Sequence, residues 1–372
     1  MLFINLRNKL PFYLLAVGIA IELVIIIVLY SPRSQQLSFV GLPENSKDFF
    51  CISTHFDDKH LRGNELADQE NNFVMSGAGS ARYDFESQYY LTKKNGDIDL
   101  SYFDHTVDFL KGQNKMIIAV LPQWGAKDSH YGDVISSPEK YGKAALMLAE
   151  YLNKKDVRFA IEVGNEPNDE GFWPDRDPEV YTKYLKEAYY AIKSVDPNIQ
   201  VITGGLVMWS SKDEKNGKYN ALDWVNAMYD SGLSDLEDML IGIHVYPGHT
   251  QPERQFEEIL AIIELMRSHH NYSGVAITEF GFPTGSDGNP ENVSEDEQAQ
   301  LLSGFYKKIT TDARLKEVVK YGCYYDLIND GSSPRIGDNY GLFSRREAKR
   351  GTSYIPKLGF GAYQEASGAS LK

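Results

Sequence analysis

Apolar runs alternate with amphipathic stretches along most of the chain. Eight runs rich in β-branched residues have the length of strands, and they cover residues 49–53, 81–85, 116–121, 159–163, 199–203, 240–246, 274–279 and 318–327. Stretches with apolar residues at helical spacing lie between them, among them 141–151, 178–193, 252–269 and 295–309. Strands that alternate with helices are typical of a parallel sheet covered by helices. Eight such units predict an α/β fold, a (β/α)8 TIM barrel. A doubly wound open sheet is the alternative, but the chain has no Gly-x-Gly-x-x-Gly turn that would seat a nucleotide.

The N-terminal pattern differs from the rest. Residues 10–30 form one apolar run that follows Arg7 and Lys9, and its length matches the roughly 20 residues that span a bilayer core. Its bulky end, residues 25–29, offers no small-residue cleavage site. We therefore expect residues 1–33 to be a cytoplasmic stub and an uncleaved transmembrane signal anchor, with the remainder periplasmic or extracellular. The alternative is a signal peptide that is cleaved, so that the protein is secreted. A linker over 34–47 and a barrel domain over 48–372 would follow.

Net charge and cysteine content limit the partners and the scaffold. The formal charge of −14 argues against a nucleic-acid partner, which requires a basic surface. Two cysteines exclude a disulfide-built scaffold and a cysteine metal site. Cys51 and Cys323 fall on the first and last predicted strands, which are neighbours in a closed barrel. We predict two buried thiols there, with a disulfide as the alternative in an exported protein.

Two of the apolar runs end in a glutamate. The fourth run breaks at Asn165-Glu166-Pro167, and the seventh ends at Glu279. The carboxyl ends of barrel strands build the active site, and strands four and seven lie nearly opposite each other. The two glutamates should therefore face each other across the mouth of the barrel. Such a pair suits glycosidic bond cleavage, in which one carboxyl group donates a proton and the other attacks the anomeric carbon. The alternative is that each glutamate pairs with a structural arginine.

These motifs resemble a known group of enzymes. Asn165-Glu166-Pro167 resembles the acid/base motif of glycoside hydrolase clan A, whose catalytic glutamates lie on strands four and seven. Residues 161–168 are most similar to family 39, which includes xylosidases, iduronidases and bacterial exopolysaccharide endoglycosidases. The likeness covers most of residues 48–365. It implies that Glu166 is the general acid/base, that Glu279 is the nucleophile, and that Asn165 binds the sugar 2-hydroxyl.

The resemblance also suggests residues that surround the two glutamates. Arg82 matches the clan's arginine on strand two, and His244 and Tyr246 match its His-x-Tyr pair on strand six. His55, just beyond strand one, is a candidate for the glycone subsite. Tyr325 stands in the region of strand eight where the clan usually has a tryptophan, a departure that leaves the substrate open.

Tryptophans supply further candidates, because indole rings stack on the apolar faces of sugars. Trp124, Trp173 and Trp209 follow strands three, four and five, with loop packing as the alternative for each, while Trp224 lies in a helical pattern and is predicted to be core. We expect no metal and no other cofactor, since the pieces at 57–60 and 269–270 lack a metal-ligand framework.

The prediction that follows is a retaining, double-displacement O-glycosyl hydrolase. We expect it to be endo-acting on a polysaccharide or oligosaccharide at the cell envelope, held at the membrane by its N-terminal helix, and associated with a polysaccharide export complex. The alternatives are a non-catalytic polysaccharide-binding subunit of an export system and a transglycosidase. We also expect like-charge repulsion from Glu279 to raise the pKa of Glu166.

Overall fold

The computed structural model describes residues 46–56, 64–85, 100–122, 137–169, 171–173, 177–208, 220–246, 252–330, 339–348 and 351–369. Within these ranges no helix is long and apolar enough to cross a membrane. The apolar run at residues 10–30 lies outside the described residues.

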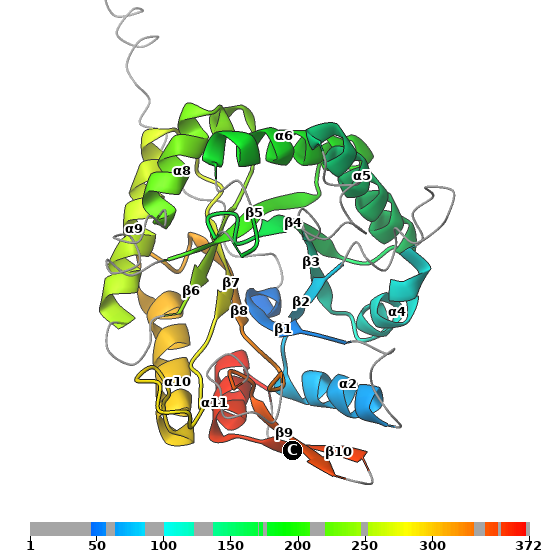
Figure 1. Ribbon diagram of the computed structural model, residues 1–372, viewed down its shortest axis with the longest axis vertical. Coiled ribbons are helices and arrows are strands. Elements are labelled where there is room, and N and C mark those ends of the chain that lie inside the picture. Colours follow the sequence, from blue (N-terminus) through cyan, green and yellow to red (C-terminus); the bar gives the residue numbers. More distant parts are fainter. Residues whose placement is uncertain are drawn as a thin grey trace, which may run out of the picture. The chain divides into compact units, whose positions relative to one another are not determined.

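Eight parallel strands close into a barrel, in the order of the sequence (Figure 1). They are β1 (Phe50–Thr54), β2 (Ser80–Asp84), β3 (Met116–Leu121), β4 (Phe159–Asn165), β5 (Gln200–Val207), β6 (Ile241–Val245), β7 (Val275–Phe280) and β8 (Val319–Tyr324). β1 pairs with β8, which closes the ring. The predicted barrel is confirmed, and the open-sheet alternative is wrong.

Helices surround the barrel (Figure 1). They are α2 (Glu65–Ser76), α4 (Asp104–Gly112), α5 (Pro138–Lys155), α6 (Pro178–Val195), α8 (Ala221–Asp230), α9 (Pro252–Ser268), α10 (Glu295–Thr311) and α11 (Leu358–Ser367), together with the 3-10 turns η2 (Ser46–Phe49), η3 (Leu100–Phe103) and η4 (Leu233–Asp235). Local sequence sets several of their starts. Asp177 caps α6 with a proline directly after it, and Ser294 and Glu297 form a capping box on α10.

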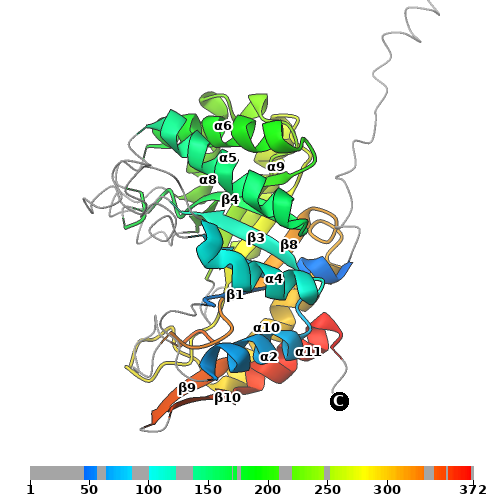
Figure 2. The ribbon, with the colours of Figure 1, turned by 90° about the vertical axis from the view of Figure 1, so that its right-hand side faces the viewer.

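The sequence pattern did not predict an antiparallel hairpin near the C-terminus, formed by β9 (Phe343–Ala348) and β10 (Gly351–Pro356). It lies beside α2 and α11 (Figure 2), and Gln69 of α2 donates to the Tyr354 hydroxyl at 3.0 Å. Charged residues of β9 such as Arg345 and Glu347 interrupt the apolar pattern, since this two-stranded ribbon is not buried on both faces.

The core has two layers. Residues inside the barrel form one cluster, which includes Ile118, Ile202 and Tyr321, and a larger cluster fills the space between the strands and the helices. Trp224 is fully buried, as predicted.

The prediction of two free thiols is wrong, because Cys51 and Cys323 form a disulfide. The β1–β8 register places the two residues directly opposite each other, with their Cα atoms 4.1 Å apart. Closure of the barrel therefore brings the first and last strands within bonding reach.

Candidate active site

Glu166 stands at the mouth of the barrel, directly after β4. The backbone turns sharply there, since Gly164 has a φ of 91° and Glu166 has a φ of 47°, both left-handed. The Glu166 amide donates to the Gly205 carbonyl at 3.1 Å. The buried Asn168 side chain fixes the next turn by accepting from the Val207 amide and donating to its carbonyl. A left-handed glutamate is a strained conformation, of the kind that proteins keep at functional sites.

Glu279 lies near the end of β7, on the other side of the mouth. The Arg82 guanidinium on β2 donates from Nη1 to Glu279 Oε1 at 2.6 Å. The hydroxyl of Tyr246, just after β6, donates to Oε2. Hydrogen bonds from a cation and a phenol stabilise the negative charge of a carboxylate. Each oxygen of Glu279 is therefore held by its own donor, one on β2 and one just after β6.

Arg82 is buried and organises several groups at once. Its Nε and Nη2 donate to Glu162 at 2.7 and 3.2 Å, and Nη2 also donates to Asn165 Oδ1 at 2.8 Å. Burial alone would lower the pKa of Arg82, but the charges of Glu162 and Glu279 raise it well above its ordinary value. One permanent cation thus orients the nucleophile candidate Glu279 and the amide of Asn165 together.

His244 on β6 lies between the two candidate catalytic glutamates. Its Nδ1 is 2.8 Å from Glu166 Oε1 and 3.5 Å from Glu279 Oε2. One carboxylate oxygen of each glutamate and one nitrogen of His244 lie within 4.8 Å of one another. Burial alone would lower the pKa of His244, but Glu279, Glu162 and Glu166 raise it to about 9. The surrounding carboxyl groups therefore favour the imidazolium form of the ring.

The pKa of Glu166 is raised, as predicted, but the main cause differs. Burial is the largest contribution, contact with the charged His244 opposes it, and repulsion from Glu279 is a smaller contribution in the same direction as burial. The two carboxyl groups are close enough to interact, yet burial does more than the charge of Glu279 to raise the pKa of Glu166.

Sequence reasoning missed Glu162, although it lies four residues before Glu166. It is fully buried inside the barrel and accepts hydrogen bonds from the Gly205 amide at 2.9 Å and from the Thr278 hydroxyl at 3.0 Å, besides those from Arg82. Burial alone would raise the pKa of Glu162, but Arg82 and His244 lower it to about 2. A glutamate within an otherwise apolar strand was the available signal, since buried carboxylates are rare without a partner.

Three tyrosine rings meet edge to face beside Glu279. The ring of Tyr246 lies 5.3 Å from that of Tyr340 and 6.3 Å from that of Tyr325, measured between centroids. Tyr340 was missed, because it comes 16 residues after the end of β8 and stands in no strand or helix. Gly281 makes room for it, since a Cβ there would lie 2.8 Å from the Tyr340 ring. Tyr325 is half-buried and joins this aromatic wall.

His55 lies beside Tyr325, between the ends of β1 and β8, with their ring centroids 5.9 Å apart. Its Nε2 is 3.9 Å from Asp326 Oδ2, and the Tyr325 hydroxyl donates to Asp330 at 3.3 Å. One ligand atom from each of His55, Asp326 and Asp330 lies within 4.8 Å of the others. This corner has the donor atoms to hold a divalent cation or to accept from sugar hydroxyls.

Of the three tryptophans predicted to stack on sugars, the structure describes Trp173. Trp173 is only 3% exposed and packs edge-on against Tyr181 and Tyr184, so we leave it out of the proposed sugar-binding surface. Trp124 and Trp209 lie outside the described residues.

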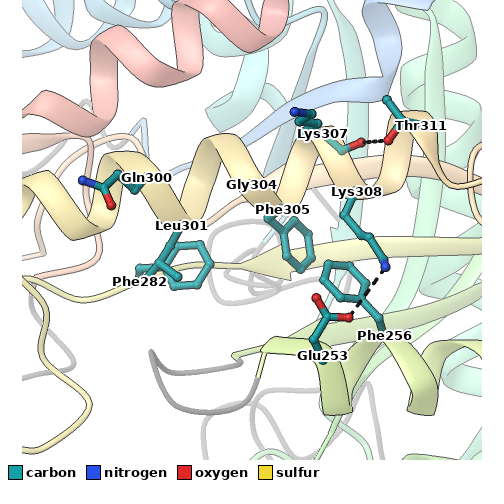
Figure 3. Close-up of a pocket in the computed structure, with 10 residues that line it drawn as sticks. All are labelled: Glu253, Phe256, Phe282, Gln300, Leu301, Gly304, Phe305, Lys307, Lys308 and Thr311. Carbon is teal, nitrogen blue, oxygen red and sulfur yellow. Dashed lines mark hydrogen bonds and ion pairs between the residues drawn. The ribbon is translucent and has the colours of Figure 1, made fainter.

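A pocket of about 330 Å³ lies elsewhere, between α9 and α10 (Figure 3). Apolar rings line it, among them Phe256, Phe282 and Phe305, and Lys308 pairs with Glu253 at 3.6 Å across its edge. Neither glutamate of the barrel mouth contributes to its lining. It is therefore separate from the candidate active site.

Comparison with known proteins places this site in a family. Residues 54–313 match the model described as cellulase, glycosyl hydrolase family 5. A curated β-xylosidase from Geobacillus stearothermophilus is 32% identical over 88 residues, which cover 22% of this chain and 17% of that protein. The chain thus spans less than a fifth of this curated relative.

Solved structures share the fold at low identity. A family 39 glycoside hydrolase from Bacteroides cellulosilyticus WH2 superposes with a TM-score of 0.61 at 19% identity, covering 89% of this chain and 66% of that one. A monomeric β-xylosidase from Caulobacter crescentus CB15 gives 0.58 at 15% identity, with 88% and 69% covered. The cellulose synthase subunit Z of Clostridioides difficile gives 0.55 at 14% identity, with 84% and 98% covered.

The family match and the folds of these structures agree with the predicted likeness to clan A and to family 39. The match covers the barrel from the end of β1 to beyond α10, including both glutamates at its mouth. The chain belongs to the cellulase family, glycosyl hydrolase family 5.

Proposed function

We propose that the protein is a retaining glycoside hydrolase, with Glu166 as general acid/base and Glu279 as nucleophile. The observation that carries the proposal is the placement of these two carboxyl groups, which present oxygens within 4.8 Å of each other. Retaining enzymes hold their carboxyl groups about 5 Å apart, whereas inverting enzymes leave room for a water molecule between them.

The reaction proceeds in two displacements. A Glu279 oxygen attacks the anomeric carbon while Glu166 gives its proton to the leaving glycosidic oxygen, which forms a glycosyl ester on Glu279 and releases the aglycone. Glu166 then takes a proton from water as the water oxygen attacks the same carbon and the ester bond breaks. Burial supports the first role of Glu166, and Arg82 and Tyr246 support the ionised form of Glu279.

Asn165 is suited to bind the sugar in this reaction. Its Oδ1 accepts from Arg82, which fixes the oxygen of the side-chain amide and leaves the nitrogen as its donor atom. A hydrogen bond from this group to the 2-hydroxyl would strengthen as charge develops at the neighbouring anomeric carbon. His55 and Tyr325 are proposed to line the glycone side.

The substrate that we propose is a polysaccharide cleaved internally at the cell envelope. The apolar run at 10–30 supports anchoring, and the Cys51–Cys323 disulfide suits an oxidising compartment outside the cytoplasm. The likeness in fold to a protein named as a cellulose synthase subunit supports a role beside a polysaccharide-producing machine. Fractionation of cells that express the full chain tests the anchor, which predicts recovery with membranes rather than in the medium.

The decisive experiment uses residues 34–372 on β-glucans, xylans and acidic polysaccharides, with new reducing ends as the readout. We expect hydrolysis by the wild type and a loss of roughly 10²- to 10⁴-fold in Glu166→Gln. Glu279→Gln should lose at least as much, because no ester can form. Glu70→Gln, which alters a glutamate paired with the exposed His105 on the helical shell, is the matched control and should keep full activity.

Product analysis separates the alternatives. A mixture of oligosaccharide lengths indicates endo action, whereas release of single sugars indicates exo action. Products longer than the substrate indicate a transglycosidase. Equal binding by the wild type and both glutamine variants, without hydrolysis by any of them, would reject the enzyme and favour a binding subunit.

A further inference from the structure

Three carboxyl groups and two cations share the centre of the barrel mouth, and only two of the carboxyl groups have a role in the proposed reaction. The remaining one is Glu162, which is fully buried beneath the mouth. It is 0% exposed and accepts two hydrogen bonds from Arg82, one from the Gly205 amide and one from the Thr278 hydroxyl. Glu162 is therefore placed to act on the site without touching a substrate.

Glu162 faces both of the cations that hold the catalytic pair. Arg82 turns one edge, Nε and Nη2, to Glu162 and presents Nη1 to Glu279. His244 turns Nδ1 to Glu166 and Nε2 toward Glu162 Oε1, which lies 3.8 Å away. Each cation thus stands between Glu162 and one of the two glutamates at the mouth.

Glu162 and Glu279 each lie against both cations of the buried centre. Arg82 pairs with both carboxyl groups, and His244 lies 3.8 Å from Glu162 and 3.5 Å from Glu279. The groups that face His244 are Glu162 and Glu166 from the β4 segment, Glu279 from β7 and Tyr246 beyond its own strand. A buried charge without a counter-charge is strongly unfavourable.

We propose that Glu162 is a positioning residue, the buried counter-charge that fixes Arg82 against Glu279 and keeps His244 charged against Glu166. The role rests on the proposed function, because it concerns how the two catalytic carboxyl groups are held. If Glu162 has this role, loss of its charge should lower the pKa of His244 and make the position of the Arg82 guanidinium less fixed.

The test is a titration of the histidine side chains by NMR in the chain 34–372, with labelled histidine. Replacement of His244 by glutamine identifies its signal among the eight histidines. In the wild type we expect this signal to titrate near pH 9. In Glu162→Gln it should titrate at a clearly lower pH, toward the ordinary histidine value of about 6.5.

Kinetics on a substrate found by the polysaccharide screen provide the second readout. Because Glu162 touches no substrate, Glu162→Gln should leave KM nearly unchanged and lower kcat on the order of 10²-fold, as expected for misplaced catalytic groups. Glu70→Gln is again the matched control, since it alters a glutamate that pairs with an exposed histidine outside the site and should leave the His244 signal where it is.

Two results would overturn the proposal. One is a His244 that is neutral at pH 7 in the wild type, a result that does not depend on the Glu162 variant. The other is a folded Glu162→Gln whose His244 titrates where the wild type does. Neither result bears on whether the wild type hydrolyses polysaccharide, so failure of the proposed function would be seen separately.

Discussion

At the residue scale, the proton on Glu166 depends on neighbours that act in opposite directions. Burial and Glu279 raise its pKa, whereas the hydrogen bond and charge of His244 lower it. The proposed reaction needs Glu166 protonated, so activity should fall as pH rises through the pKa of Glu166 and form the alkaline limb of the pH profile.

Replacement of His244 by glutamine should move this limb to higher pH. The cation that lowers the pKa of Glu166 is then gone, so the acid keeps its proton further into the alkaline range. The measurement is kcat/KM as a function of pH. The maximum value of kcat/KM should also fall, because Glu166 and Glu279 both lose their contact with His244. A limb that stays in place or moves to lower pH would contradict this account. Glu166→Gln, assayed on an aryl glycoside whose leaving group needs no proton, should have no such limb.

At the element scale, the backbone of one strand can set the position of a side chain on the next strand. This is the case for β5 and the His244 ring on β6. The sequence pattern ended the fifth strand at residue 203, but β5 continues to Val207 through Gly204 and Gly205. Two adjacent glycines are typical of a turn, but here they lie within a strand. Gly205 has no side chain, and the His244 ring occupies the space where one would be. A Cβ on Gly205 would lie 2.1 Å from His244 Nε2 and 2.6 Å from the Thr278 hydroxyl oxygen.

Gly205→Ala should therefore displace the His244 ring and break its contact with Glu166. We expect a loss of activity on the order of 10²-fold and destabilisation of about 1–3 kcal/mol from overpacking. Kinetics and urea unfolding measure the two effects. Gly361→Ala in α11, where a Cβ would meet nothing within 4 Å, should leave activity unchanged. If Gly205→Ala and Gly361→Ala have the same activity and the same stability to urea, the barrel can make room for a Cβ at Gly205. The prediction is then wrong.

At the scale of the whole molecule, closure of the barrel joins parts of the chain that are far apart in sequence. Cys51 and Cys323 are separated by 272 residues and are linked between β1 and β8. A crosslink over a long loop limits the unfolded chain more than the folded one. The disulfide belongs to the interior of the barrel, in the apolar cluster with Ile118 and Tyr321.

Replacement of both cysteines by alanine should lower the free energy of unfolding by about 2–4 kcal/mol with little change in kcat. Urea unfolding of the double variant, compared with the wild type before and after reduction, measures this. The reduced wild type should approach the double variant. If oxidised and reduced wild type unfold at the same urea concentration, the disulfide does not stabilise the barrel.

The amino-acid sequence by itself determined the order of strands and helices, and with it the barrel and the two glutamates at its mouth. Those features can be predicted from the sequence, because they depend on local periodicity and on the positions where apolar runs end. The disulfide could not be predicted with certainty, because the sequence shows that β1 and β8 are neighbours but not which of their residues lie opposite each other. The register of the two strands places Cys51 opposite Cys323. Only the tertiary structure brought Glu162, Arg82 and His244 into one buried network, placed Tyr340 beside Glu279, and buried Trp173 against two tyrosine rings. These residues lie far apart in sequence or in loops without periodicity, and burial and charge pairing arise only when the strands close around them.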